Sequence, residues 1–451
     1  MTTRVLVPSG VLGLGFSERA LAQAMQLKPD IICIDGGSTD SGPAYLGTGT
    51  TKYSRAVCKA EWKLLMRARH ALGIPLVISS CGTCGTDSMV DWMFALTREI
   101  ATELGQHPKV VSLYTEQILS QVQNAFKTQR IQILEPEVPL SENIIKQCSH
   151  IVALAGREQI TAALNCGADI VLAGRATDTA ALCALPIANG EHEAAAWHGA
   201  KIAECGAFCS TNPSSGVVML SVDQQGFTIQ AIADDAFCTP HSVSAHMLYE
   251  NANPHQLVEP GGTLDASNAT YTAIDRHTVR VEGSRWETAK QYTVKLEGAR
   301  SRGFQTTILA LIRDPHYVKN VHLWADKLRA FLVDQLQTRL DIAPDQYSLE
   351  FRIIGSNATF GALETKTEGA TEVGVLGIVT SSTQALSDDI MRFANPFVLH
   401  YPLTVDEPMP SFAFPYSPAE TSRGETFEFC LNHVMRIDDP MQVFKLTQEV
   451  L

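Results

Sequence analysis

The first half of the chain alternates short apolar runs with amphipathic stretches. The apolar runs are bounded by Gly, Ser, Pro and Asp and predict strands at 5–7, 31–34, 74–80, 110–113, 151–154 and 169–172. Between the runs, apolar residues recur at helical spacing. This spacing predicts helices over 18–26, with Ser17 as the cap, over 55–72 and over 88–104. Strands separated by such helices predict βαβ units and a mostly parallel sheet that is covered on both faces.

The pattern changes near Pro213, where short alternating runs replace the strand–helix repeat. The sequence predicts two paired strands around Asp223, then short strands and one long helix, at 217–222, 226–232, 277–281, 291–296, 348–354, 373–379 and 321–338. We therefore expect an α/β N-terminal domain over 1–235, which carries the site, followed by a smaller α+β C-terminal domain over 236–451. The boundary near residue 235 rests on this change of pattern alone.

Composition narrows the class of protein. The 451 residues are 45% hydrophobic and 18% charged, which is typical of a globular enzyme. The net charge of −13, from 48 acidic and 35 basic residues, argues against a nucleic-acid partner. We expect no membrane partner, because no apolar run approaches the roughly 18 residues that span a bilayer. The first residues are not typical of a signal peptide, so we expect a cytoplasmic protein with reduced thiols, and a homo-oligomer on base rates.

Polar residues cluster where the predicted parallel strands end. Ligands of open parallel sheets bind beyond the carboxyl ends of the strands, so these loops are the place to look for a site. The candidates for catalysis are Asp35, Asp40, Cys81, Cys84 and Asp87, and the candidates for substrate binding are Ser9, Ser38, Thr83, Arg175 and Asp178.

The loop over 79–88 is the sharpest of these features. Its small residues lead into the N-terminus of a helix, where free N–H groups favour an anion. A thiol at such a place has a lowered pKa, so Cys81 or Cys84 is a candidate base, nucleophile or metal ligand. In the alternative interpretation, glycine allows the turn, Thr86 or Asp87 caps the helix, and the two cysteines only pack.

The charged candidates have two interpretations each. Arg175 suits bidentate binding of a substrate carboxylate or phosphate, or else it pairs with Asp178 and caps the next helix. Asp35 and Asp40 are candidates for binding a divalent cation or for acid and base catalysis, and Asp40 is also typical of a turn.

Cofactors are only weakly indicated by the spacing of residues. Cys81 and Cys84 have the C-x-x-C spacing, but zinc, iron–sulfur or redox chemistry needs partners that the neighbouring sequence lacks. A second cysteine pair, Cys205 and Cys209, has x3 spacing. We therefore predict at most one metal, a divalent cation that is oxygen-ligated rather than thiolate-ligated. The glycines after the first strand follow G-x-x-G-x-G rather than G-x-G-x-x-G, which disfavours nicotinamide cofactors. His246 is interpreted as a structural histidine.

Several stretches resemble the acyclic terpene utilisation family, AtuA. They are Val5–Gly10, Ile34–Pro43, Ser80–Asp87, Gly167–Asp178, His198–Ala207, Leu248–Pro254 and Phe427–His433. The resemblance spans nearly the whole chain. It implies a place in catabolism of citronellol- and geraniol-like terpenes, which proceeds through branched acyl-CoA thioesters, or in another small-acid pathway.

These observations lead to two hypotheses about function. In the first, the protein is a lyase (a hydratase or dehydratase) or an isomerase that acts on a branched or hydroxylated carboxylate or its CoA thioester. Arg175 would bind a carboxylate, the loop over 81–87 would donate N–H groups to an enolate oxygen, and Asp35, Asp40 or a thiolate would move the proton. In the second, the protein is a non-catalytic subunit that binds an acyl ligand or serves in assembly of a catabolic complex.

Overall fold

A computed structural model describes residues 2–135, 139–251, 253–365 and 369–451. The chain divides into two compact units. The first unit comprises residues 1–300 and 429–451, and the second comprises residues 301–428. Strands β15 (Thr293–Ile312) and β18 (Glu420–Arg436) have residues in both units.

A ten-stranded mixed sheet organises the described part of the first unit. Its five central strands pair in parallel, in the order β1, β2, β3, β7, β4. Antiparallel strands extend the sheet on both sides, β8, β9, β13 and β12 beside β1, and β19 beside β4. The strands are β1 (Thr3–Val7), β2 (Ile31–Asp35), β3 (Leu76–Ser79), β7 (Ile170–Ala173), β4 (Lys109–Tyr114), β8 (Val218–Val222), β9 (Gly226–Ala231), β13 (Thr278–Glu282), β12 (Thr270–Ala273) and β19 (Lys445–Val450). The predicted parallel sheet is present, within a mixed sheet.

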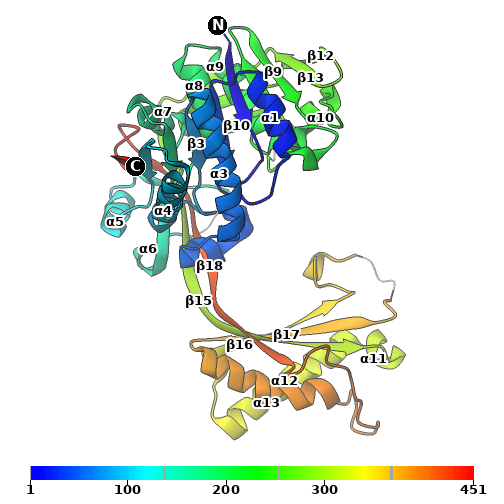
Figure 1. The fold of residues 1–451 in the computed structure, drawn as a ribbon. Coiled ribbons are helices and arrows are strands. Elements are labelled where there is room, and N and C mark those ends of the chain that lie inside the picture. The colour runs from blue at the N-terminus through cyan, green and yellow to red at the C-terminus, as the bar shows by residue number, and fades with distance from the viewer. Residues whose placement is uncertain (1, 136–138, 252, 366–368) are drawn as a thin grey trace. The chain divides into compact units, whose positions relative to one another are not determined.

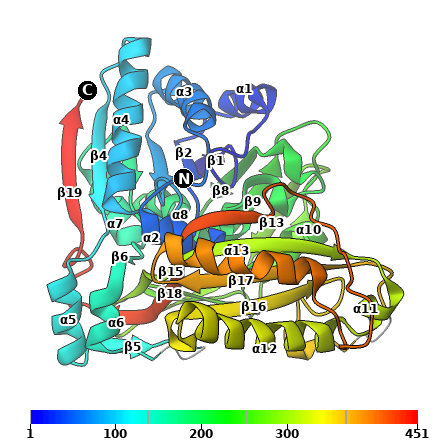
Figure 2. The ribbon, with the colours of Figure 1, turned by 90° about the horizontal axis from the view of Figure 1, so that it is seen from below.

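Helices cover both faces of this sheet because the central strands are apolar on both sides. In β2, Ile32 and Ile34 pack into the core of one face, whereas Ile31 and Cys33 pack into the core of the other. The first core includes residues of α1 (Glu18–Gln26), α3 (Arg55–Leu72) and α4 (Asp87–Leu104), and the second includes residues of α7 (Arg157–Asn165), α8 (Ala180–Ala188) and α9 (Glu193–Ala203) (Figure 1, Figure 2).

The ends of the first helices follow local signals. Helix α1 begins after Ser17, whose side chain accepts a hydrogen bond from the backbone of Ala20, as the sequence predicts. Helices α3 and α4 end at Gly73 and Gly105, both in the left-handed conformation that glycine adopts without strain. The predicted bounds of α1 and α3 are confirmed.

One predicted strand of the parallel sheet lies elsewhere. Strand β6 (Cys148–Ala153) does not join the parallel strands but pairs antiparallel with β15 in a second sheet of six strands. An apolar run indicates a strand but carries no information about its partner. The partner here is β15, which begins 140 residues further along the chain, so only folding brings the two together.

The rest of the first unit consists of short elements. Strands β10 (Gln256–Glu259), β11 (Gly262–Asp265) and β14 (Arg285–Thr288) form a three-stranded antiparallel sheet. The other elements are helices α2 (Pro43–Thr48), α5 (Leu119–Lys127), α6 (Glu142–Gln147) and α10 (Pro240–Ala245), and strand β5 (Ile131–Ile133), which pairs with β18.

The second unit is an antiparallel sheet with helices, an α+β arrangement. Strands β16 (Tyr347–Ile354) and β17 (Val373–Ser381) pair in antiparallel order with the second-unit residues of β15. One core holds side chains of this sheet together with helices α11 (Pro315–Lys319), α12 (Val321–Leu340) and α13 (Gln384–His400).

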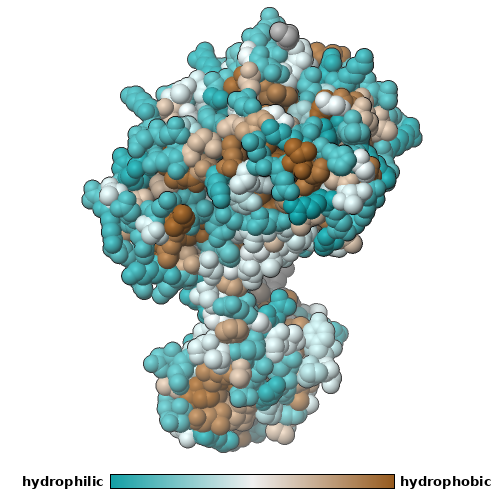
Figure 3. All heavy atoms as spheres, turned by 60° about the vertical axis from the view of Figure 1, so that its left-hand side comes forward, coloured by the Kyte–Doolittle hydropathy of each residue, from teal (hydrophilic) through white to brown (hydrophobic). Residues whose placement is uncertain are grey.

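The predicted boundary near residue 235 differs from the division into these two units. Strand β9 lies before this boundary and β13 after it, yet the two pair along their length. The C-terminal strand β19 pairs with β4. Backbone hydrogen bonds therefore hold residues on both sides of 235 in one sheet. Among the described residues, no helix has the length and apolar character that crossing a membrane requires. Figure 3 shows hydrophilic side chains over most of the face it presents, with hydrophobic side chains in separate patches.

Candidate functional site

Three loops meet at the carboxyl edge of the central sheet. Asp35 is the last residue of β2, Cys81 follows β3 by two residues, and Arg175 follows β7 by two residues. The loops touch through their backbones, because a Cβ on Gly85 would lie 2.1 Å from the backbone nitrogen of Arg175. A Cβ on Gly36 would lie 2.6 Å from the carbonyl oxygen of Ser80. The prediction that these strand ends lie together at one sheet edge is confirmed.

A pocket of about 620 Å³ opens at this edge. Five of the predicted site residues line it, namely Ser9, Asp35, Ser38, Asp40 and Asp178. The other five lie outside the lining, namely Cys81, Thr83, Cys84, Asp87 and Arg175. The pocket volume is in the range of small-molecule sites.

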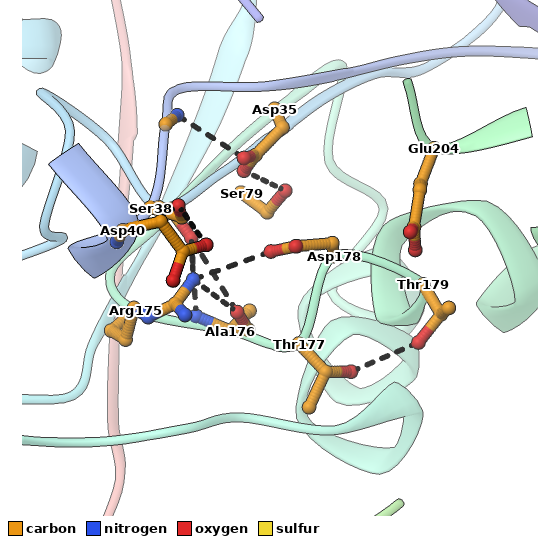
Figure 4. A network of polar contacts seen from close by, with 12 residues as sticks. Asp35, Ser38, Asp40, Ser79, Arg175, Ala176, Thr177, Asp178, Thr179 and Glu204 are labelled. Carbon is orange, nitrogen blue, oxygen red and sulfur yellow. Dashed lines mark hydrogen bonds and ion pairs between the residues drawn. The ribbon is translucent and has the colours of Figure 1, made fainter. Parts of the chain in front are cut away.

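Asp35 is a buried acid in the pocket wall whose pKa is strongly raised. Its Oδ1 accepts a hydrogen bond from the Ser79 hydroxyl at 2.8 Å, and its Oδ2 accepts one from the backbone N–H of Gly37 at 3.2 Å (Figure 4). The side chain is buried. Burial and then the negative charge of Asp178 raise the pKa of Asp35 to about 8, against the hydrogen bond from Ser79 and the positive charge of Arg175.

This pKa predicts how stability depends on pH. A carboxyl whose pKa rises from 3.8 to about 8 on folding binds its proton more tightly in the folded chain. Its contribution to stability is complete below about pH 4 and is lost as the pH rises through about 8. We therefore expect Asp35→Asn to gain stability relative to the native chain between about pH 5 and pH 8, measured as the free energy of unfolding in urea. If the free energies of unfolding of Asp35→Asn and the native chain differ by a constant amount over this range, the raised pKa of Asp35 is contradicted.

Arg175 lies in a buried network of ion pairs. Its Nε donates to Glu297 Oε2 at 3.0 Å, and its Nη1 donates to Ser80 Oγ at 3.1 Å. Nη1 also donates to the carbonyl of Ala176 at 3.0 Å and to Asp178 Oδ1 at 3.3 Å (Figure 4). Two of its three nitrogens are therefore occupied by the protein. The guanidinium therefore has no free pair of nitrogens for the predicted bidentate binding of a substrate carboxylate. The alternative, an ion pair with Asp178, is confirmed.

Glu297 is the main counter-charge of Arg175. Both side chains are buried, and Lys295 Nζ contacts the second oxygen of Glu297 at 2.9 Å. Burial raises the pKa of Glu297, but the charges of Arg175 and Lys295 outweigh it and lower the pKa to about 2. Glu297 was not among the predicted site residues, because it lies in β15, far from every strand-end motif.

The thiols of the third loop are buried, contrary to the prediction of a lowered pKa. Cys81 is 0% exposed and Cys84 is 1% exposed. Burial raises the pKa of Cys81 far above its ordinary value and that of Cys84 to about 12. A thiol that water does not reach lacks the solvation that stabilises a thiolate. The interpretation in which the cysteines pack fits this geometry.

The backbone N–H groups of this loop are largely occupied, contrary to the predicted role as donors to an enolate oxygen. The N–H of Cys81 donates to the carbonyl of Ala173, that of Thr83 to Gly36 and that of Gly85 to Cys81. Thr83 has φ of 86°, which is rare for a β-branched residue.

The helix N-terminus after this loop already holds an anion from the protein. The N–H of Asp87 donates to the Glu116 carboxylate at 3.0 Å, and Asp87 Oδ1 accepts from the N–H of Glu116 at 3.1 Å. His150 contacts Glu116 at 2.6 Å. Burial is the main cause that raises the pKa of Asp87 to about 6. Asp87 therefore belongs to a cluster outside the pocket lining.

The second loop supplies a turn and a cation to the pocket. The Ser38 hydroxyl donates to Asp40 Oδ2 at 2.7 Å and accepts from the N–H of Asp40, so Asp40 lies in a turn that Ser38 caps. Thr83 Oγ1 accepts from the N–H of Lys52 at 3.0 Å and so holds the backbone of a lining residue.

The pocket wall is predominantly acidic. Among the described lining residues the only ammonium group is that of Lys52, whereas carboxyl groups come from Asp35, Asp40, Asp178, Glu204 and Glu250. The ionised acids of such a wall repel a free carboxylate, and its protonated acids can donate hydrogen bonds to an uncharged polar group.

The structure adds residues from the end of α9 to this wall. Glu204 and Cys205 follow α9 and line the pocket, and the buried Lys201 Nζ contacts Glu204 Oε1 at 2.5 Å. Ligand atoms of Glu204, Cys205 and His246 lie within 4.8 Å of one another. In the described part of the chain, the five predicted catalytic residues do not form such a group. Glu204 lies within His198–Ala207, one of the stretches that resemble a known family, and this is the signal that could have marked it.

A known protein family matches most of the chain. No curated protein matches, and no solved structure matches. The family model described as Acyclic terpene utilisation family protein AtuA matches residues 50–405, which is more than half of the chain. The match includes the loops around Cys81 and Arg175 and the end of α9, whereas Asp35 and Asp40 precede it. The resemblance seen in the sequence is confirmed, and the chain belongs to the acyclic terpene utilisation family AtuA.

Proposed function

We propose that this protein is an enzyme of branched small-acid catabolism that moves a proton next to a carbonyl group, as a hydratase, dehydratase or isomerase. The observation that carries this proposal is Asp35, a buried carboxyl in the wall of the pocket with a pKa of about 8. An acid or base is most effective when its pKa lies near the working pH. Family membership supports a substrate derived from acyclic terpenes.

The reaction starts with transfer of a proton to the Asp35 carboxylate. The proton leaves the carbon next to the carbonyl, and the electron pair of the C–H bond moves onto the carbonyl oxygen as an enolate. In an isomerisation, Asp35 returns the proton to a different carbon. In a dehydration, the electron pair returns from the enolate oxygen to form a C=C bond, the C–O bond to a hydroxyl group on the next carbon breaks, and that group leaves as water with the proton that Asp35 took up. Ser79 and Gly37 hold the Asp35 carboxyl in place throughout.

The acidic wall supports a substrate whose reacting end is uncharged. A CoA thioester presents a neutral carbonyl, whereas a free carboxylate would face the carboxyl groups of Asp40 and Asp178. The C–H next to a thioester is also the more acidic one. We therefore favour branched acyl-CoA thioesters over the free acids.

The test is exchange of substrate hydrogen with solvent. The purified full-length chain is incubated in D₂O with branched and hydroxylated acids and with their CoA thioesters, and mass spectrometry follows deuterium entering next to the carbonyl. We expect exchange with at least one thioester, since proton abstraction precedes either reaction. Binding without exchange across the panel would contradict the proposal and favour the second function, a non-catalytic subunit that binds acyl ligands.

A further inference from the structure

Three side chains with different ligand atoms converge beside the pocket, at the end of helix α9. Glu204 and Cys205 are adjacent in sequence, and His246 comes from the turn that follows α10. One carboxylate oxygen, the Sγ and one ring nitrogen lie within 4.8 Å of one another. These are the oxygen, sulfur and nitrogen ligands that Zn²⁺ takes in proteins.

His246 has a polar atom that the fold leaves without a partner. The residue is 5% exposed, and its Nε2 is buried with no hydrogen bond to any described residue. The ring stacks on Tyr249 with centroids 5.3 Å apart, which holds it in place. Buried polar atoms are nearly always satisfied, so an orphaned nitrogen on an imidazole that also meets a carboxylate and a thiol indicates a ligand.

The backbone around Cys205 is built to bring these residues to the pocket. A Cβ on Gly10 would lie 2.9 Å from the Cα of Cys205, so glycine at position 10 is what allows the approach. Gly206 has φ of 58°, and a Cβ there would lie 2.5 Å from the carbonyl oxygen of Gly216. The turn that carries Glu204 and Cys205 is therefore packed tightly against the loop after β1.

Lys201 is the cation that already contacts this group. Its Nζ lies 2.5 Å from Glu204 Oε1. A carboxylate has two oxygens, so Glu204 can bind a metal through one while Lys201 keeps the other. A metal ligand that also accepts a hydrogen bond from a neighbouring side chain is the usual arrangement at protein metal sites.

We propose that Glu204, Cys205 and His246 bind one Zn²⁺ whose fourth coordination position faces the pocket. Bonds of about 2.0–2.3 Å to each ligand bring ligand atoms to less than about 4 Å from one another, a small closure from the geometry seen. Glu204 and Cys205 line the pocket, so a substrate can reach the ion. Thiolate ligation departs from the oxygen-ligated cation that the sequence predicts.

A Zn²⁺ ion at this site would stabilise the enolate of the proposed reaction. This catalytic role rests on the proposed function. An enolate needs positive charge near its oxygen, and the loop N–H groups predicted for this task are largely occupied. Zn²⁺ polarises a carbonyl as a Lewis acid. Binding of the ion itself does not depend on the reaction.

The test measures binding of the metal alone. The full-length chain is stripped with a chelator, kept reduced, and titrated with Zn²⁺ by calorimetry and with Co²⁺ by absorbance. We expect one ion per chain, release of the thiol proton, and a thiolate-to-Co²⁺ charge-transfer band in the near ultraviolet. Cys205→Ser and His246→Asn should each weaken Zn²⁺ binding at least tenfold, and Cys205→Ser should abolish the band.

Matched variants control for the other cysteines and histidines. Cys166→Ser replaces a second half-buried thiol, and His241→Asn replaces an exposed histidine five residues before His246. Both should bind Zn²⁺ as the native chain does. Stoichiometric binding that survives Cys205→Ser and His246→Asn would overturn the proposal, as would no binding by the native chain at micromolar Zn²⁺.

A measurement on the native chain tests the metal site even if the variants fail to fold. Iodoacetamide labelling with and without Zn²⁺, read by mass spectrometry, should show Cys205 protected at least tenfold by the ion while Cys166 labels at the same rate. Equal labelling of Cys205 in both conditions would overturn the site. None of these readouts uses activity, so the exchange assay tests the proposed function separately even if the metal site is overturned.

Discussion

Asp35→Asn is expected to reduce the rate of deuterium exchange into an acyl-CoA substrate by about 10²–10⁴-fold, the usual contribution of a general acid or base. The amide keeps the size of the side chain and can still accept from Ser79, but it cannot take up the substrate proton. The reduction corresponds to about 2.7–5.4 kcal/mol of transition-state stabilisation.

Asp389→Asn is the matched control for this effect. Asp389 lies in helix α13 of the second unit, its side chain is 69% exposed, and it makes an ion pair with Arg392 at 3.4 Å. The same chemical change there should leave the exchange rate within about twofold, because isolated surface charges contribute little. An Asp35→Asn protein that binds the substrate and exchanges at the native rate would remove Asp35 from the site.

Arg175→Met is expected to destabilise the first unit by about 3–5 kcal/mol, the cost of leaving one member of a buried ion pair without its partner. Glu297 would keep its charge inside the protein with only Lys295 to offset it. Burial alone lowers the pKa of Arg175, but the charges of Glu297 and Asp178 hold the pKa above its ordinary value, so the guanidinium stays charged. The measurement is the free energy of unfolding in urea.

The double variant Arg175→Met/Glu297→Gln tests whether the loss of stability in Arg175→Met comes from the unpaired charge of Glu297. Removing both charges should recover part of the loss, because no uncompensated carboxylate remains. Arg392→Met breaks an exposed ion pair and should cost at most about 1 kcal/mol.

Arg175→Lys separates the two roles that the sequence left open for this residue. It keeps the charge but loses hydrogen bonds, so we expect lower stability with little change in kcat/KM. Unchanged stability with kcat/KM reduced at least tenfold would instead assign Arg175 to substrate binding.

Local signals predicted the secondary structure well. The cap at Ser17 and the glycines at positions 73 and 105 lie in the chain next to the helices they bound, so the sequence carries them directly. The apolar runs of β1, β2, β3, β4 and β7 are likewise local, and parallel strands joined by helices have few alternative arrangements. The position of Asp35 at the carboxyl edge followed from these facts.

Predictions about chemistry failed where the outcome depends on distant neighbours. A cysteine at a helix start is acidic only if water or positive charge reaches it, and Cys81 and Cys84 are closed off by the packing of the surrounding loops. Arg175 was expected to keep a free fork, but Glu297, which lies 122 residues away, occupies one of its nitrogens. The proximity of His246 to Glu204 and Cys205 likewise depends on folding and could not be predicted from the sequence.

The sequence by itself determined the parallel core, the helices that cover it and the edge at which the polar loops gather, because hydrophobic periodicity and helix caps act within a few residues. Only the tertiary structure decided which of those polar groups face the pocket, which are neutralised in ion pairs and which are buried. Burial and charge compensation depend on contacts such as Arg175 with Glu297 and Gly10 with Cys205, between residues far apart in the chain. These contacts set pKa values and ligand geometry, and no local pattern encodes them.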